Sequence, residues 1–344
     1  MDFSKYNYEL SQDFECIKTV DMHTEGEPLR IIVDGFPEIK GNTILEMRNY
    51  CKENLDNYRT ALMFEPKGHA DMYGLIPVKP ERDDSDFGVL FIHNEGYSTM
   101  CGHATLAITK FAVEMGWVKA IEPITTVKID APCGQLTSYA KVKNGEVESV
   151  EFDCVPSFVV ALDEEIEVKE LGKVRYDLAY GGAFYAYVNA DQLDLELIPE
   201  NYQKCIDYGM KIKHAVMDQK DNVIHPFEED LSFLYGTIFI SDSNKVDSRN
   251  VCVFAEGEVD RCPTGSGVSG RMAIHKERNE LAFNEKMKIE SILDTVFECS
   301  YHSEIEYGPF KAVIPRVKGN AYYTGKSEFV IDPNDPLQNG FIFR

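Results

Sequence analysis

Two similar glycine-containing runs most constrain the fold of this chain, because they imply that one structural unit occurs twice. The first run reads STMCGHAT over residues 98–105, and the second reads DRCPTGSG over residues 260–267. Aligned on the glycine that follows, the reactive position is the thiol of Cys101 in the first run and the hydroxyl of Thr264 in the second. This unequal pair predicts chemistry with one strong base rather than two.

A stretch with a helix-compatible pattern follows each run. Residues 104–115 carry an apolar face and stop at Gly116, and residues 268–281 form the second stretch. Both reactive positions are therefore expected at helix N-termini, which carry unpaired N–H groups and partial positive charge. Such a position lowers the pKa of a thiol, so we expect Cys101 to form thiolate near neutral pH.

The same helix ends form a predicted carboxylate site. If they face each other, the backbone N–H groups of Gly102, His103, Gly265 and Ser266 grip one carboxylate from both sides. Drawing charge onto that carboxylate makes a Cα proton removable. Each residue alone has an ordinary structural explanation, since a cysteine before glycine is usually a core thiol. The pairing of the two runs is what favours a catalytic site.

Strand-like segments also repeat ahead of each run. Residues 17–21 lead through a glycine turn to 29–33, and residues 174–178 lead through two glycines to 184–188. Irregular alternation of strands and helices predicts an α/β or α+β fold. The repeated order predicts two similar lobes. We expect the boundary between them in or shortly after the acidic stretch 162–167.

Charge and composition exclude several classes of protein. The net charge of −23 argues against nucleic acid or an anionic membrane as a partner. No apolar run is long enough to span a bilayer. The first residues show no signal-peptide pattern, so we expect a cytoplasmic protein. The nine scattered cysteines are then reduced thiols, most of them inert in the core.

Neither a nucleotide site nor a metal site is predicted. Residues 265–270 fit GxGxxG, but Pro263 and Thr264 directly precede them, where a dinucleotide site requires a strand. Residues 319–327 resemble a P-loop with one residue too many between the glycines. Cys101 is near His103 in sequence, yet no partner pair lies at a metal-ligand spacing. We therefore expect no cofactor.

Five long motifs make the chain similar to the proline racemase family over nearly its full length. They are DMHTEGEP at 21–28, EPKGHADMYG at 65–74, HNEGYSTMCGH at 93–103, DRCPTGSG at 260–267 and DPLQNGF at 335–341.

The resemblance implies a fold like that of diaminopimelate epimerase, in which two similar α/β lobes flank a cleft. It also implies catalysis without a cofactor and usually a homodimer. In that fold the C-terminal segment returns to the first lobe. The implied lobes are residues 1–165 plus 328–344, which carry Cys101, and residues 166–327, which carry Thr264.

One position departs from the racemase pattern. Racemases and hydroxyproline 2-epimerases of the family carry a cysteine in both runs, whereas here Thr264 holds the second position and Cys262 lies two residues earlier. This Cys/Thr pair resembles the trans-3-hydroxy-L-proline dehydratase branch. The resemblance also implies that His103 and Asp260 contact the ring nitrogen of a cyclic imino acid substrate.

The chemistry of a single thiol agrees with dehydration. Racemisation needs an acid and a base on opposite faces of Cα, and a threonine hydroxyl is too weak an acid to alternate with a thiolate. In trans-3-hydroxy-L-proline the hydroxyl and the Cα proton lie on the same face. Cys101 alone can take that proton and return it to the departing hydroxyl, while Thr264 holds or orients the substrate. The product, Δ2-pyrroline-2-carboxylate, then tautomerises to the Δ1 imine.

Two alternatives stay open at this point. A proline racemase or 4-hydroxyproline 2-epimerase would need Cys262 to reach the cleft. A non-catalytic amino-acid-binding protein would bind pyrrole-2-carboxylate, a planar mimic of the deprotonated substrate, without turnover.

Overall fold

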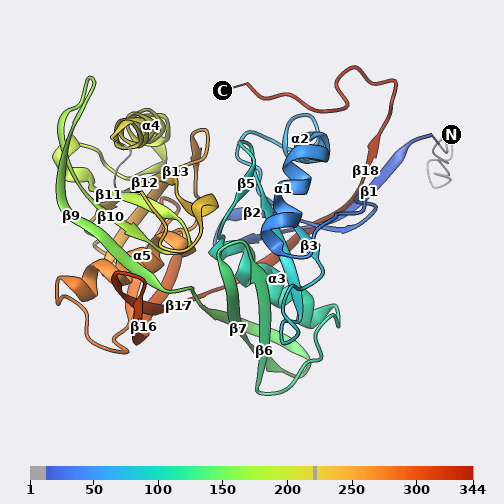
Figure 1. Ribbon diagram of the computed structural model, residues 1–344, viewed down its shortest axis with the longest axis horizontal. Coiled ribbons are helices and arrows are strands. Elements are labelled where there is room, and N and C mark those ends of the chain that lie inside the picture. The colour runs from blue at the N-terminus through green and yellow to red at the C-terminus, as the bar shows by residue number, and fades with distance from the viewer. Residues whose placement is uncertain (1–12, 220–222, 344) are drawn as a thin grey trace.

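The computed structural model describes residues 13–219 and 223–343, and its elements form two groups side by side (Figure 1). The first half of the chain runs β1 (Glu15–Thr24), β2 (Glu27–Asp34), α1 (Ile44–Asn54), α2 (Asp56–Met63), β3 (Gly74–Val78), β4 (Phe87–Ile92), β5 (Tyr97–Ser98), α3 (Gly102–Glu114), β6 (Ile124–Ala131), β7 (Gly134–Lys143), β8 (Glu146–Asp153) and β9 (Ser157–Val168).

The second half has a similar series. It runs β10 (Gly172–Tyr180), β11 (Phe184–Asn189), α4 (Tyr202–Asp218), β12 (Leu234–Ser241), β13 (Ser248–Phe254), β14 (Glu258–Val259), α5 (Gly265–Glu277), β15 (Met287–Glu290), β16 (Val296–Tyr307), β17 (Phe310–Gly319) and β18 (Ala321–Ile331). Short 3-10 helices lie at Ala190–Leu193, Pro199–Asn201 and Glu229–Leu231. Among the residues described, no helix is both long enough and apolar enough to cross a bilayer.

Strand pairing in the second half repeats that of the first. The β1–β2 hairpin, the parallel pair β2–β3 and the antiparallel series β3–β4–β5 recur as β10–β11, β11–β12 and β12–β13–β14. After each central helix, β6 pairs parallel with β4 as β15 does with β13. The series β6–β7–β8 and β15–β16–β17 then continue antiparallel. This duplicated order confirms the predicted mixed α/β fold of two similar lobes.

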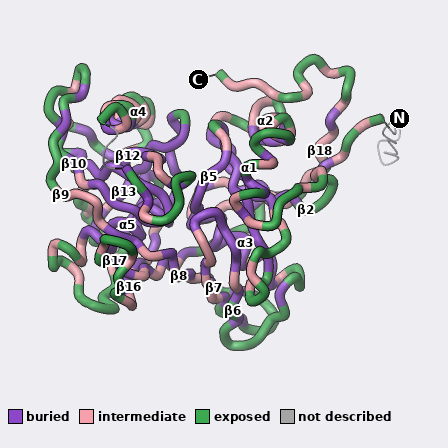
Figure 2. Tube along the Cα trace, in the orientation of Figure 1, coloured by how far each residue is buried: buried purple, intermediate pink, exposed green. Residues whose placement is uncertain are grey.

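A buried helix forms the centre of each lobe. The α3 helix packs against β1, β2, β7, β8 and β18, and α5 packs against β9, β10, β16 and β17. Nearly all of α3 and the first ten residues of α5 are buried, so neither helix has a solvent-facing side over that length (Figure 2). A helix enclosed on all sides needs small or apolar residues around its whole circumference. The glycines and serines of α5 meet that need.

Two strands cross between the halves. β18 pairs along its whole length with β1, so the C-terminal part of the chain returns to the first lobe. β9 pairs with β10 and with β17 of the second half. The acidic stretch 162–167, where the domain boundary was predicted, lies inside β9 and is largely exposed. The boundaries 1–165 plus 328–344 and 166–327 stay a prediction.

Both predicted helices exist but are shifted toward the N-terminus. The first begins at Gly102 rather than at residue 104 and ends at Glu114, just before Gly116 with φ +75°. The second begins at Gly265 rather than at residue 268 and ends at Glu277, well before residue 281. It stops there because Asn279 takes a left-handed conformation with φ +58°, which an α-helix does not continue through.

Candidate active site

A small cavity of ≈ 20 Å³ lies where the N-termini of α3 and α5 meet. All seven site residues predicted from the sequence line it, together with five others. Its lining consists of Tyr73, Met100, Cys101, Gly102, His103, Tyr185, Tyr235, Phe254, Asp260, Thr264, Gly265 and Ser266. The volume is about that needed for one water molecule. The cavity is therefore too small to hold a cyclic amino acid, and we refer to this arrangement as the closed conformation.

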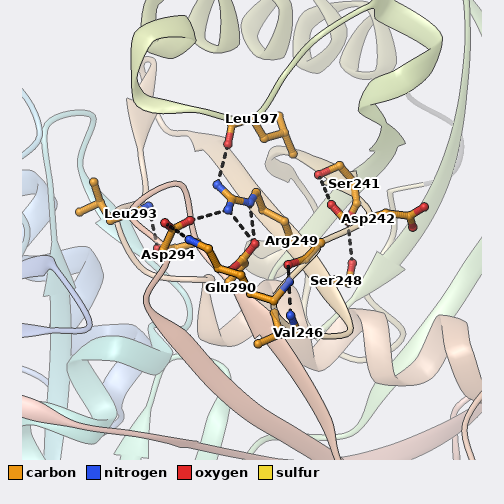
Figure 3. A network of polar contacts seen from close by, with 12 residues as sticks. Leu197, Ser241, Asp242, Val246, Ser248, Arg249, Glu290, Leu293 and Asp294 are labelled. Atoms are coloured by element: carbon orange, nitrogen blue, oxygen red, sulfur yellow. Dashed lines mark hydrogen bonds and ion pairs between the residues drawn. The ribbon is translucent and has the colours of Figure 1, made fainter.

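A larger cavity of ≈ 710 Å³ lies elsewhere in the second lobe and contains none of the predicted residues. Its central cation, Arg249, is already bound by Glu290, Asp294 and the carbonyl of Leu197 (Figure 3). The Arg249 guanidinium thus already forms its hydrogen bonds and ion pairs with groups of the protein itself. We place the chemistry at the small cavity because the reactive side chains meet there.

The helices α3 and α5 touch at their first residues. A Cβ atom added to Gly102 would lie 2.5 Å from the Cα of Gly265, and the reverse substitution would clash equally. Only glycine allows this approach. The backbone amides at the two helix starts, including those of His103 and Ser266, belong to first turns and lack intrahelical acceptors. Two such ends in contact have the geometry expected of the predicted carboxylate site, whose role stays a prediction.

Cys101 caps α3. Its backbone is extended, with φ −144°, and its Sγ accepts a hydrogen bond from the N–H of Ala104 at 3.4 Å. The same sulfur lies 3.1 Å from Nδ1 of His103. The Cys101 sulfur thus accepts a hydrogen bond from an N–H group of the first turn, which has no backbone acceptor. The helix can therefore start earlier than its apolar pattern predicts. The side chain is 5% exposed.

The expected lowering of the thiol pKa is wrong for this closed conformation. Burial raises the pKa of Cys101 well above its usual range, which outweighs the opposing hydrogen bond from Ala104, and the nearby Asp260 and Glu27 carboxylates raise it further. Burial also lowers the pKa of His103 to about 3, so its imidazole is neutral. A helix N-terminus stabilises a thiolate only where water or a counter-charge also reaches it.

Asp260 belongs to a buried pair of carboxyl groups. Its Oδ1 accepts from the N–H of Cys262 at 2.9 Å, and Glu27 of β2 accepts from the N–H of Arg261 at 2.7 Å. Burial raises the pKa of both carboxyls, and the charge of Asp260 raises that of Glu27 further. Two buried carboxyl groups in contact do not both ionise easily, and of the two the pKa of Glu27 is raised further, by the charge of Asp260. We did not predict Glu27 as a site residue, although it lies in the motif at 21–28.

Thr264 precedes α5 in a strained conformation. Its φ is +69°, which is rare for a β-branched residue. Unlike Cys101, it makes no capping hydrogen bond to its helix. Its hydroxyl is buried near Asp260 and Cys252 but makes no hydrogen bond of good geometry among the residues described. Strain and an unpaired hydroxyl at a cavity are typical of functional positions.

Cys262 does not line the cavity. It is fully buried, and its sulfur accepts a hydrogen bond from the N–H of Thr264 at 3.4 Å. Ligand atoms of His103, Asp260 and Cys262 nevertheless lie within 4.8 Å of one another, a grouping that sequence spacing did not indicate. Three donors are one short of a closed tetrahedral zinc site. Catalysis without a metal stays a prediction.

Aromatic residues of the cavity also escaped the sequence analysis. They are Tyr73, Tyr185, Tyr235 and Phe254, which lie apart in the chain and outside both glycine runs. The only signal was that Tyr73 lies within the motif at 65–74. The strand order brings the others to the cavity, and no local pattern encodes that.

Comparison with known proteins identifies close relatives. A family model described as proline racemase matches residues 19–342. A trans-3-hydroxy-L-proline dehydratase from Colwellia psychrerythraea is 53% identical over 99% of this chain and 97% of its own length. The human trans-3-hydroxy-L-proline dehydratase is 44% identical over 95% of each chain. A crystal structure of a hydroxyproline epimerase from Agrobacterium vitis, with bound trans-4-OH-L-proline, matches with a TM-score of 0.91 at 27% identity, over 97% of this chain and 96% of that one.

Proposed function

The chain belongs to the proline racemase family, and from that premise we propose that it is a hydro-lyase that removes water from trans-3-hydroxy-L-proline. The observation that carries the proposal is the unequal pair in the cavity, where Thr264 lines the wall with Cys101 and no second thiol does. Relatives that bear the dehydratase name at 53% and 44% identity support the same choice.

In the proposed reaction, the amides at the starts of α3 and α5 bind the substrate carboxylate. The ionised carboxylate of Asp260 binds the ring ammonium, beside His103. Lobe opening hydrates Cys101, and the substrate then brings a positive charge into the site. Both effects favour the thiolate over the thiol.

Cys101 thiolate then removes the Cα proton, and the electron pair forms the Cα–Cβ double bond as the C–O bond breaks. The new thiol returns its proton to the departing hydroxyl, which leaves as water. One residue serves both steps because proton and hydroxyl lie on one face of the ring. The Δ2-pyrroline-2-carboxylate released tautomerises to the Δ1 imine without the enzyme. Thr264 orients the substrate, and no cofactor takes part.

The racemase alternative requires a second acid on the opposite face. Cys262 is the nearest candidate, but its sulfur is buried behind Thr264 and outside the cavity lining. We expect a cytoplasmic homodimer, as the family resemblance implies.

Incubation of the purified protein with trans-3-hydroxy-L-proline tests the proposal. An imine trap such as o-aminobenzaldehyde should turn yellow as Δ1-pyrroline-2-carboxylate forms. Change of optical rotation of L-proline without imine would indicate a racemase instead. Binding of pyrrole-2-carboxylate without turnover of either compound would indicate a non-catalytic binding protein.

A further inference from the structure

The hydroxyl groups of three tyrosines at the cavity differ in their hydrogen bonds. The hydroxyl of Tyr185 shares a hydrogen bond of 2.7 Å with Oγ of Ser266. Those of Tyr73 and Tyr235 are buried and lie close to each other and to Ser98, but neither makes a hydrogen bond of good geometry among the residues described. Buried polar groups are nearly always paired, and unpaired ones at a cavity call for an explanation.

Packing fixes each of these rings. Tyr73 meets the His103 ring edge-on, with centroids 4.8 Å apart. Tyr235 packs on Phe254 at 5.3 Å and on Tyr185 at 5.8 Å. The two residues are 2% and 5% exposed. Rigid aromatic rings of this kind present their hydroxyls at defined points.

The Tyr73 hydroxyl lies on the Cys101 side of the cavity. The Tyr73 ring contacts the His103 ring, whose Nδ1 lies 3.1 Å from the Cys101 sulfur, so Tyr73 and Cys101 are neighbours. Burial raises the pKa of Tyr73 and of Cys101, whereas the Tyr73 hydroxyl as a hydrogen-bond donor opposes the rise for Cys101. Cys101 takes the Cα proton in the proposed reaction. The 3-hydroxyl of the substrate lies on that same face of the ring, so it projects toward this group of side chains.

We propose that the hydroxyls of Tyr73 and Tyr235 bind the 3-hydroxyl of the substrate and donate to its oxygen as it departs. The proposal rests on the dehydratase function. As the C–O bond breaks, the oxygen gains negative charge, and two phenol donors stabilise it until the Cys101 thiol delivers the proton. These tyrosines also determine specificity, since a substrate without the hydroxyl leaves them unpaired.

Phenylalanine variants with a matched control test this role. Tyr73→Phe and Tyr235→Phe should each lower kcat/KM for dehydration about 10-fold or more, and the double variant about 100-fold or more. The Kd for pyrrole-2-carboxylate, which has no 3-hydroxyl, should change less than about twofold. Tyr180→Phe is the control, because Tyr180 has a buried, unpartnered hydroxyl outside the cavity lining. It should alter neither value.

Three results would overturn the proposal. Unchanged dehydration in the double variant would show that the hydroxyls do not assist departure. An equal loss of pyrrole-2-carboxylate binding would show that they only maintain the shape of the site. A wild-type protein that binds this mimic but never releases water would remove both this proposal and the dehydratase function. If one variant unfolds early in a circular dichroism melt, the other single variant decides.

Discussion

The Cα atoms of Gly102 and Gly265 approach so closely that neither residue tolerates a side chain. A Cβ on Gly102 would lie 2.5 Å from the Cα of Gly265 and 3.1 Å from its carbonyl carbon. Backbone atoms at a helix start cannot turn aside as a flexible side chain does. This contact places the free amides of both helices around one small volume, and the substrate carboxylate is expected there.

Gly102→Ala should therefore separate the two helix starts. We expect kcat/KM for dehydration to fall at least about 100-fold, since displacement of about 1 Å has that effect on a positioned reaction. Gly325→Ala is the control, because an added Cβ there meets nothing within 4 Å. Normal turnover in Gly102→Ala would mean that the carboxylate binds elsewhere.

Cys101→Ser tests the base directly. An alcohol is several pKa units harder to ionise than a thiol, so turnover should fall about 10²–10⁴-fold. Iodoacetate should inactivate the wild type, and pyrrole-2-carboxylate should protect it. Full activity in the serine variant would eliminate the proposed mechanism.

The pH profile should be governed by the thiol rather than by histidine. Burial raises the pKa of Cys101, so kcat/KM should increase as pH rises and thiolate forms. Since burial lowers the pKa of His103 to about 3, the profile should show no limb near pH 6.5. A limb near that value, lost in His103→Asn, would assign histidine an ionising role.

Asp260 and Glu27 should respond differently to amide substitution. Asp260→Asn removes the charge that is proposed to bind the ring ammonium, and KM should rise about 10- to 100-fold. Glu27→Gln replaces a carboxyl whose pKa is raised by burial and by the charge of Asp260, so we expect KM to change less than about threefold. Steady-state kinetics of the two variants decide this, and equal effects would place the charge on both carboxyls or on Glu27.

Local patterns in the sequence were sufficient to predict part of this site. The two helix starts and the duplicated strands were readable because glycine, apolar periodicity and turn residues act over short distances. Tyr235 and Glu27 were not predicted, because only the strand order brings them to Cys101. The thiol pKa was predicted in the wrong direction for the closed site. Desolvation of the Cys101 thiol depends on how tightly the two lobes pack against each other, and no local sequence motif encodes that packing.

Thr264→Cys tests the asymmetry of the two runs. Threonine at φ +69° is strained, and cysteine lacks the branch at Cβ that worsens this strain, so the exchange fits the backbone. The variant has a thiol beside the start of each helix. A proton removed from one face of Cα could then be replaced from the other. We expect new racemisation of L-proline, with part of the dehydration lost.

Cα–H exchange in D2O makes the result of this substitution unambiguous. With L-proline, the two-thiol variant should form deuterated D-proline, whereas the wild type exchanges at most into L-proline and forms no D-isomer. Rates should be modest, because the closed cavity is only ≈ 20 Å³ and a thiol is larger than a hydroxyl. Thr264→Ser is the control, since it keeps a hydroxyl and should not racemise. Wild-type racemisation as fast as dehydration would show that Cys262 or another group already supplies the second acid, and the assignment as a dehydratase would then be wrong.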